Sequence, residues 1–214
     1  MRLYLEAAGR PPGTVLDLAC GTGRHLRELV SAGVDSVGLD LSDVLLAEAR
    51  AASPRVRLVQ ADMRGLPFAD GVFAGLTSFF TSFGYFRTRA EDRRVAREAR
   101  RALRSRGTFM LDFFNAERVR DELVPRDERR IGDRVVVQTR RILEDTVVKR
   151  ILIRHPDTGA PDREFEERVR LYTPEELETL LRAEGLATRA RFGDYGGGEF
   201  DRDAERLILV GAAA

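Results

Sequence analysis

The chain of 214 residues contains one cysteine, one lysine and no long apolar run. Cys20 has no second cysteine with which to form an intramolecular disulfide, which favours a reducing, cytoplasmic location. No run approaches the roughly 20 apolar residues of a membrane span, and the first residues do not resemble a secretory signal. The formal net charge is +1, so no field of one sign is present to hold a polyanion, and nucleic acid is the less favoured partner.

Two further absences narrow the kind of nucleotide site. The apolar run 15–18 ends in Gly21 and Gly23, a turn in which backbone can approach a ligand closely at the end of a buried strand. The third glycine of a GxGxxG dinucleotide fingerprint is missing. Lys149, the single lysine, lies far from this turn, which excludes a phosphate-binding P-loop. No pyrophosphate site is therefore predicted.

The residues that follow the turn predict an adenosine site. From Arg24, apolar residues recur at helical spacing until Gly33, and 37–39 is typical of a second buried strand. Asp40 ends that strand. An acid at this place in a strand–helix–strand unit accepts hydrogen bonds from both ribose hydroxyls.

Three segments, in order, resemble the class I methyltransferases that use S-adenosylmethionine: Asp17-Leu-Ala-Cys-Gly-Thr-Gly23, Asp40, and Gln60-Ala-Asp-Met63. The resemblance covers nearly the whole chain and implies that Asp40 binds ribose and Asp62 binds adenine. The segment 77–85 and the late insertion are most similar to small-molecule N-methyltransferases, including those that dimethylate amino sugars. The implied cofactor-binding residues are Asp17, Ala19, Gly21, Gly23, Arg24, Asp40, Leu41, Asp62, Met63, Ser78 and Phe79.

The order of elements predicts an α/β fold. Strand-like runs at 56–59, 72–80 and 108–114 alternate with a helical pattern at 91–103, whereas 134–143, 146–154 and 163–172 indicate antiparallel strands. A capping box at Thr173 to Glu176 begins a last helix, and 187–192 and 206–210 are the last strands. We expect a Rossmann-like, seven-stranded, mostly parallel sheet with helices on both faces, and a small antiparallel β insertion after the fifth strand. The expected parts are a cofactor-binding core (1–127), an insertion over the active site (128–172) and a segment that completes the core (173–214).

The expected chemistry needs no nucleophilic side chain, because a sulfonium methyl is already activated and catalysis comes largely from holding the acceptor in line. The acceptor is a nitrogen or oxygen of a small molecule. Expected substrate-binding residues are Phe80, Tyr85, Phe114, Asn115 and Tyr172, and the candidates for a catalytic residue are Asp112, Tyr85 and His155. Structural alternatives stay open: Asp112 caps a turn, Asn115 caps the next helix, Tyr172 packs, and His155 is merely exposed.

Other features allow two interpretations each. Arg24, more than His25, is placed to meet the methionine carboxylate of the cofactor. Cys20 is interpreted as a small apolar filler, and the arginines of 87–106 as a solvated helix face rather than a nucleic-acid contact. The two histidines lack the spacing of metal ligands, so no metal is expected. Only 1–13 precede the first motif, so we expect the aromatic cover over the cofactor to be short or missing, with Tyr4 as a partial substitute, and weak cofactor affinity.

Three functional hypotheses follow. The favoured one is methyl transfer to a small amine or hydroxyl compound by a monomer or homodimer. The second is methyl transfer to RNA or protein, which predicts a basic surface continuous with the site. The third is a protein that binds S-adenosylmethionine without turnover.

Overall fold

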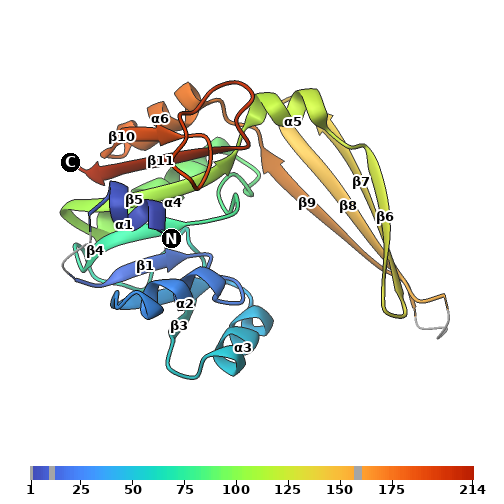
Figure 1. Ribbon diagram of the computed structural model, residues 1–214, viewed down its shortest axis with the longest axis horizontal. Coiled ribbons are helices and arrows are strands. Elements are labelled where there is room, and N and C mark those ends of the chain that lie inside the picture. The colour runs from blue at the N-terminus through green and yellow to red at the C-terminus, as the bar shows by residue number, and fades with distance from the viewer. Residues whose placement is uncertain (1, 10–12, 157–160) are drawn as a thin grey trace.

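A seven-stranded sheet forms the centre of the computed structural model, which describes residues 2–9, 13–156 and 161–214 (Figure 1). Its strand order is β10-β11-β5-β4-β1-β2-β3, and β11 runs antiparallel to both of its neighbours. The expected mostly parallel sheet with an antiparallel end is therefore confirmed. The strands are β1 (Val15–Leu18), β2 (Ser36–Asp40), β3 (Arg57–Gln60), β4 (Phe73–Ser78), β5 (Leu103–Phe114), β10 (Leu186–Phe192) and β11 (Arg206–Ala213).

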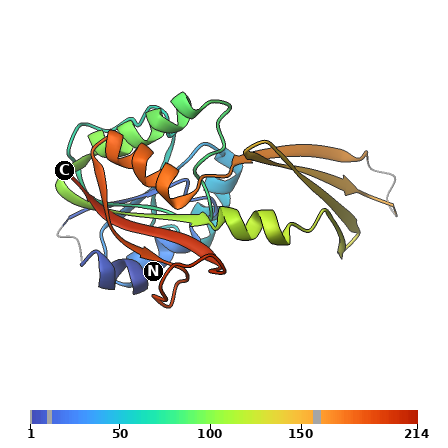
Figure 2. The ribbon, with the colours of Figure 1, turned by 90° about the horizontal axis from the view of Figure 1, so that it is seen from above.

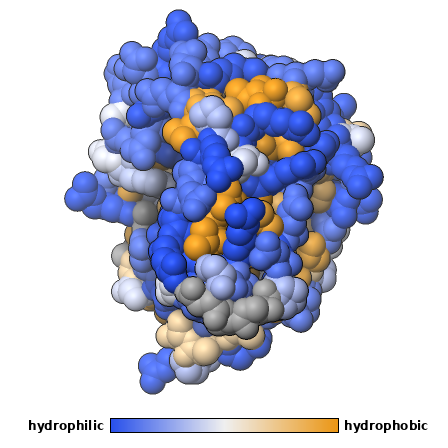
Figure 3. Space-filling view, turned by 90° about the vertical axis from the view of Figure 1, so that its right-hand side faces the viewer, coloured by the Kyte–Doolittle hydropathy of each residue, from blue (hydrophilic) through white to orange (hydrophobic). Residues whose placement is uncertain are grey.

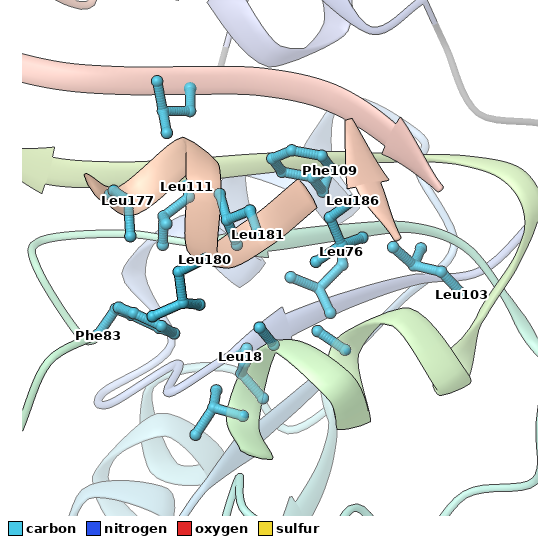
Figure 4. Close-up of a cluster of buried hydrophobic side chains, with 14 of the residues drawn as sticks. Leu18, Leu76, Phe83, Leu103, Phe109, Leu111, Leu177, Leu180, Leu181 and Leu186 are labelled. Atoms are coloured by element: carbon cyan, nitrogen blue, oxygen red, sulfur yellow. The ribbon is translucent and has the colours of Figure 1, made fainter. Parts of the chain in front are cut away.

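Helices cover both faces of this sheet, because successive side chains of a strand point to opposite faces. On one face, Met110 of β5 packs with residues of the first two helices; on the other, Phe109 and Leu111 pack with α4 and α6 (Figure 4). The helices are α1 (Arg2–Ala7), α2 (Arg24–Ser31), α3 (Asp43–Ala52), α4 (Arg89–Ala102), α5 (Ala116–Glu122) and α6 (Pro174–Ala183). No helix among the described residues is long and apolar enough to cross a bilayer.

Capping side chains determine where two of these helices begin. At the start of α6, Thr173 and Glu176 form the predicted capping box, with Pro174 in the first turn. Thr88 and Glu91 form a second one at α4, which starts two residues before the predicted position. Both caps lie at the edge of the sheet where β4 and β5 end.

Four antiparallel strands form a second sheet, here called the arm: β6 (Arg126–Ile131), β7 (Arg134–Leu143), β8 (Thr146–Arg154) and β9 (Arg163–Arg170). Three of them were predicted. Strand β6 was missed because five of its six residues are charged, so it lacks an apolar alternation and is held by its pairing with β7. The arm extends away from the core, and among the described residues no helix covers either of its faces (Figures 1 and 2).

The root of the arm is tied to the core through buried charges. The Arg170 guanidinium contacts Asp92 of α4 at 3.3 Å and Asp145 at 3.2 Å, and the Arg170 N–H donates to the Gly84 carbonyl at 2.9 Å. Tyr172 is fully buried and donates its hydroxyl to Asp92 at 2.7 Å. Burial raises the pKa of the Asp92 carboxyl. These contacts connect the arm, α4 and the loop 79–87, which follows β4.

Replacement of Leu177 by alanine tests the packing of α6 on the sheet. Leu177 is fully buried, so we expect the free energy of unfolding to fall by about 2–5 kcal/mol in urea denaturation. Leu143→Ala is the matched control, since that side chain is 42% exposed at the end of β7, and its effect should stay within about 0.5 kcal/mol. Equal losses in both variants would contradict the assignment of α6 to the core.

Candidate functional site

The turn after β1 is shaped by left-handed backbone and by a carboxylate. Ala19, Gly21 and Gly23 have φ of 57°, 54° and 72°. Asp40, at the end of β2, accepts the Gly21 N–H at 2.8 Å and the Ser42 N–H at 2.9 Å. Each carboxylate oxygen keeps further lone pairs for a ligand. A Cβ atom at Gly21 would meet nothing within 4 Å, so open space lies in front of the turn.

Behind the turn the packing is tight. A Cβ atom at Gly38 of β2 would lie 2.7 Å from Cys20 Sγ, so this glycine lets β2 pass close to the turn. Cys20 is buried, and burial raises the pKa of its thiol to about 12. A thiol in this state is no nucleophile, which agrees with its interpretation as a filler.

Asp17 of β1 is a buried carboxylate, only 2% exposed, with one polar partner, the Thr77 hydroxyl at 2.9 Å. Burial, with a smaller contribution from the charge of Asp40, raises the pKa of Asp17 to about 7. Among the described residues no basic side chain forms an ion pair with it. The site therefore offers an uncompensated carboxylate to a cationic group of a ligand.

The candidate adenine residues lie beyond β2 and β3. Leu41 is 66% exposed beside Asp40, an open apolar surface for a flat ring. The Asp62 carboxylate accepts a hydrogen bond from Arg64 Nη2 at 2.6 Å, and the same guanidinium forms an ion pair with Glu91 of α4 at 2.5 Å. The Arg64 side chain holds the pKa of Asp62 below its ordinary value. This pairing was not predicted, and an adenine amino group would share the Asp62 carboxylate with a guanidinium.

Met63 and Ser78 come together although they were predicted from separate motifs. Both line a small cavity of about 30 Å³ in the core, together with Leu18 and Phe83. The hydroxyl-bearing side chain of Ser78 is thus buried beside apolar neighbours at the end of β4.

Aromatic and basic side chains gather where β4 ends and α2 begins. The His25 ring stacks on Phe79 with centroids 4.2 Å apart, and the Arg24 guanidinium lies 4.5 Å from the centre of the Phe80 ring. Burial, with the nearby charge of Arg24, lowers the pKa of His25 to about 4, so His25 is neutral at pH 7. Arg24 is therefore the cation at this position, which supports its preference over His25.

Asp112 of β5 organises the neighbouring turn. Its fully buried carboxylate accepts the Phe80 N–H at 2.7 Å, Arg206 Nε at 2.7 Å and the Tyr195 hydroxyl. Phe80 and Thr81 both have positive φ, 56° and 60°, a conformation that costs roughly 1–3 kcal/mol for a residue other than glycine. Asp112 thus maintains a strained turn, as its structural alternative implied, instead of presenting a free base.

The remaining predicted residues are dispersed. Asn115 caps α5 through the Glu117 N–H and donates to the carbonyls of 201, 202 and 204, so its side chain is committed to the fold. Tyr172 packs in the core, whereas Tyr85 is 45% exposed on the loop after β4.

Two further predicted residues lie away from the glycine turn. His155 follows β8 toward the free end of the arm, with Nδ1 3.9 Å from Asp133. Tyr4 is buried under the sheet with its hydroxyl 3.2 Å from Thr108 Oγ1, so it covers no ligand.

Beside Asp112, a cavity of about 730 Å³ opens between α5, the root of the arm and the start of β11. Arg206 belongs both to this cavity and to the Asp112 network. Four arginines and four acids balance each other in the wall, around an apolar floor. The lining residues are Phe114, Asn115, Arg118, Val119, Glu122, Leu123, Val124, Asp127, Glu128, Arg129, Arg140, Glu205 and Arg206.

Comparison with known proteins identifies the class. The methyltransferase domain family matches residues 15–107. The dTDP-3-amino-3,6-dideoxy-α-D-glucopyranose N,N-dimethyltransferase of Streptomyces fradiae is 30% identical over 179 residues, 81% of this chain and 70% of that one. Two further curated relatives align over only 33% and 32% of their own length.

Solved structures agree. An S-adenosylmethionine-dependent methyltransferase from Clostridium acetobutylicum shares the fold, with a TM-score of 0.85 and 20% identity over 99% of this chain and 88% of that one. An amino pentose methyltransferase from Micromonospora echinaspora, solved with S-adenosylmethionine bound, has a TM-score of 0.70 and 26% identity over 100% and 87%. The chain belongs to the class I S-adenosylmethionine-dependent methyltransferases.

The residues on the glycine turn fit this cofactor. When bound, its sulfonium would supply an activated methyl group, and its ammonium and sulfonium are cations that the buried Asp17 carboxylate would accommodate. Asp40 accepts hydrogen bonds from two backbone N–H groups and lies in a place suited to the ribose hydroxyls. Among the described residues Arg24 has no acidic partner, so its guanidinium is available to bind the carboxylate of the cofactor.

Loss of the Asp40 carboxylate tests the ribose contact. We expect Asp40→Ala to weaken S-adenosylmethionine binding about 100-fold in calorimetry, since hydrogen bonds to a charged group and the anchor of the Gly21 turn are removed together. Asp70→Ala is the control, because Asp70 is an exposed acid paired with Arg101. Affinity retained in Asp40→Ala would place the ribose elsewhere.

Asp17 makes a distinct pH prediction. The cationic cofactor binds the carboxylate form, which is lost below a pKa of about 7, so affinity should fall up to about tenfold per pH unit below that value. The folding stability of the protein without cofactor should change with pH in the opposite direction to the affinity. There the folded state retains a proton that the unfolded chain has lost, so stability falls as pH rises from about 4 to about 7. Calorimetry from pH 5.5 to 8 checks this, and Asp17→Asn should bind with a flat profile; a wild-type affinity independent of pH would refute it.

Proposed function

We propose that this methyltransferase acts on an amine nitrogen of a small polar compound, of the amino-sugar class, bound in the cavity beside Asp112. The observation that carries this proposal is the shared residue Arg206, which joins the cavity wall to the turn of Phe80 at the cofactor edge. A sugar ring has hydroxyls for charged groups and an apolar C–H face for side chains such as Phe114 and Val119.

The relatives support the nature of the acceptor. The Streptomyces fradiae relative is named for dimethylation of a nucleotide-linked amino sugar, and the Micromonospora echinaspora structure is of an amino pentose methyltransferase. The compounds in both names carry an amine on a sugar. A cytoplasmic location is part of the same proposal, in keeping with a free thiol at Cys20.

The charges on α4 argue against a nucleic-acid acceptor. Arg93 and Arg97 both contact Glu184, at 2.7 and 3.0 Å, and Arg101 contacts Glu98 and Asp70. These three arginines are largely neutralised by acids of the protein, so they offer little counterion release to a polyanion. The balanced wall of the cavity leads to the same conclusion.

In this proposal the protein acts by placement. The Asp112 network holds the Phe80 turn, the root of the arm holds the loop 79–87, and the cavity orients the acceptor toward the cofactor edge. No side chain of the site needs to become a nucleophile.

A methyl-transfer assay tests this function. The protein is incubated with S-adenosylmethionine and, in parallel, with dTDP-3-amino-3,6-dideoxy-α-D-glucopyranose, the same amino sugar without the nucleotide, its 3-hydroxy analogue and total RNA. We expect methylated product from an amino sugar, detected by mass, at rates that change little with salt. Methylation of RNA alone, with a steep salt dependence, would overturn the proposal.

Blocking the cavity locates the acceptor. Val119→Trp places a large side chain in the cavity, and we expect KM for the methylated amino sugar to rise at least about tenfold while cofactor affinity is unchanged. Val72→Trp is the matched control, since Val72 is 48% exposed just before β4, at the opposite edge of the sheet. An unchanged KM in Val119→Trp would mean that the acceptor binds outside this cavity.

A further inference from the structure

Tyr195 lies at the tip of a short glycine-rich turn between β10 and β11. The Asp194 carboxylate accepts the N–H groups of Gly196 at 2.6 Å and Gly198 at 3.1 Å, and the Gly193 N–H donates to the Gly198 carbonyl at 2.8 Å. These bonds hold the turn in a compact shape. Tyr195 then reaches from it to Asp112 in β5, where its hydroxyl forms a hydrogen bond.

The direction of that hydrogen bond follows from the partners of Asp112. The carboxylate is fully buried, forms an ion pair with Arg206 at 2.7 Å and accepts the Phe80 N–H at 2.7 Å. Both partners donate a hydrogen to the Asp112 carboxylate, whose oxygens act as acceptors. The phenol of Tyr195 is therefore the donor, and its oxygen lone pairs are left to accept.

The phenol lies at the exposed edge of the site. Tyr195 is 37% exposed as a residue, and the centroid of its ring is 6.4 Å from that of Phe80, which is 53% exposed. Arg24, at the start of α2, lies over the same Phe80 ring. Tyr195 therefore lies beside the strained turn of Phe80 and Thr81, and Phe80 in turn contacts Arg24 at the end of the glycine turn.

We propose that Tyr195 is a catalytic residue whose phenolic oxygen accepts a hydrogen bond from the N–H of the acceptor amine. This inference rests on the proposed function. During transfer the nitrogen lone pair forms the new bond to the methyl carbon, the carbon–sulfur bond breaks with its electron pair on sulfur, and the nitrogen then loses a proton to water. Positive charge develops on nitrogen as the bond forms, so the hydrogen bond to Tyr195 strengthens in the transition state.

Tyr195 orients the amine and does not deprotonate it. Burial and the adjacent Asp112 carboxylate raise the pKa of the phenol above its ordinary value, while the charges of Arg206 and Arg24 act in the opposite sense. The phenol stays neutral near pH 7 and keeps its own hydrogen on Asp112. The fall of the methylation rate at low pH, the acid limb of the pH profile, is therefore due to protonation of the acceptor amine.

Tyr195→Phe tests this role, because it removes the accepting oxygen and keeps the ring. The probe is whichever amino sugar the wild type methylates, with or without its nucleotide. We expect kcat to fall about 10- to 100-fold, the effect of one hydrogen bond to a developing charge, with unchanged cofactor affinity and an unchanged acid limb. Tyr4→Phe is the matched control, since it also loses one partly buried phenol hydrogen bond, to Thr108 under the sheet, and it should retain wild-type kcat.

The outcomes separate the two proposals. A wild type that methylates no amine overturns the proposed function and this inference with it. A wild type active on an amine together with a fully active Tyr195→Phe overturns the inference alone. A variant that loses cofactor affinity in parallel with kcat, or whose acid limb shifts, also overturns it, because Tyr195 would then cover the cofactor or act as the base.

Discussion

Three buried carboxylates near the ends of central strands of the sheet determine how the rest of the site is built. Asp17, Asp40 and Asp112 lie in β1, β2 and β5 and are at most 9% exposed. A buried charge is costly unless it is paired or hydrogen-bonded, so each needs partners. Asp112 has an arginine, a phenol and a backbone N–H, whereas Asp40 has two N–H groups and Asp17 has one hydroxyl. Asp17, which has the fewest partners among the described residues, would be the one left for the charges of the cofactor.

The acid with the most partners has a different task. Asp112 joins β5, the turn after β4, the start of β11 and the glycine-rich turn of Tyr195, four segments that are distant in the sequence. A second buried acid, Asp92, joins α4 to the root of the arm through Arg170 and Tyr172. The loop 79–87 lies between these two anchors. In the proposed reaction the rate depends on how the acceptor is positioned. The two anchors fix the loop 79–87 and would thereby help to orient the acceptor.

The arm adds surface and shape to this edge. In the part of the chain that the structure describes, neither face of the arm has a covering helix, and Ile131 and Phe165 are 58% and 50% exposed. Seen from the free end of the arm, the molecule is mostly hydrophilic, with hydrophobic patches between hydrophilic residues (Figure 3). Its root supplies part of the wall of the large cavity, through β6 and β7.

Local patterns were sufficient for the fold and for the cofactor. The glycine turn, Asp40, the capping box at Thr173 and the last two strands are contiguous signals, and each is found where it was predicted. Strand β6 was missed because charge conceals its periodicity. Tyr172 and Asn115 were named for the substrate on their positions at strand ends, yet their polar atoms bind Asp92 and the carbonyls of 201–204.

Spacing within single turns and strands was enough to predict the class of fold and the cofactor, and it led to the prediction that Asp40 meets the ribose. Only the tertiary structure decided which polar groups are free. Tyr195 and Arg206 lie 83 and 94 residues from Asp112, and no local pattern links them. Pairing across such distances is set by sheet order and burial, and it turned Asp112 from a candidate base into an anchor.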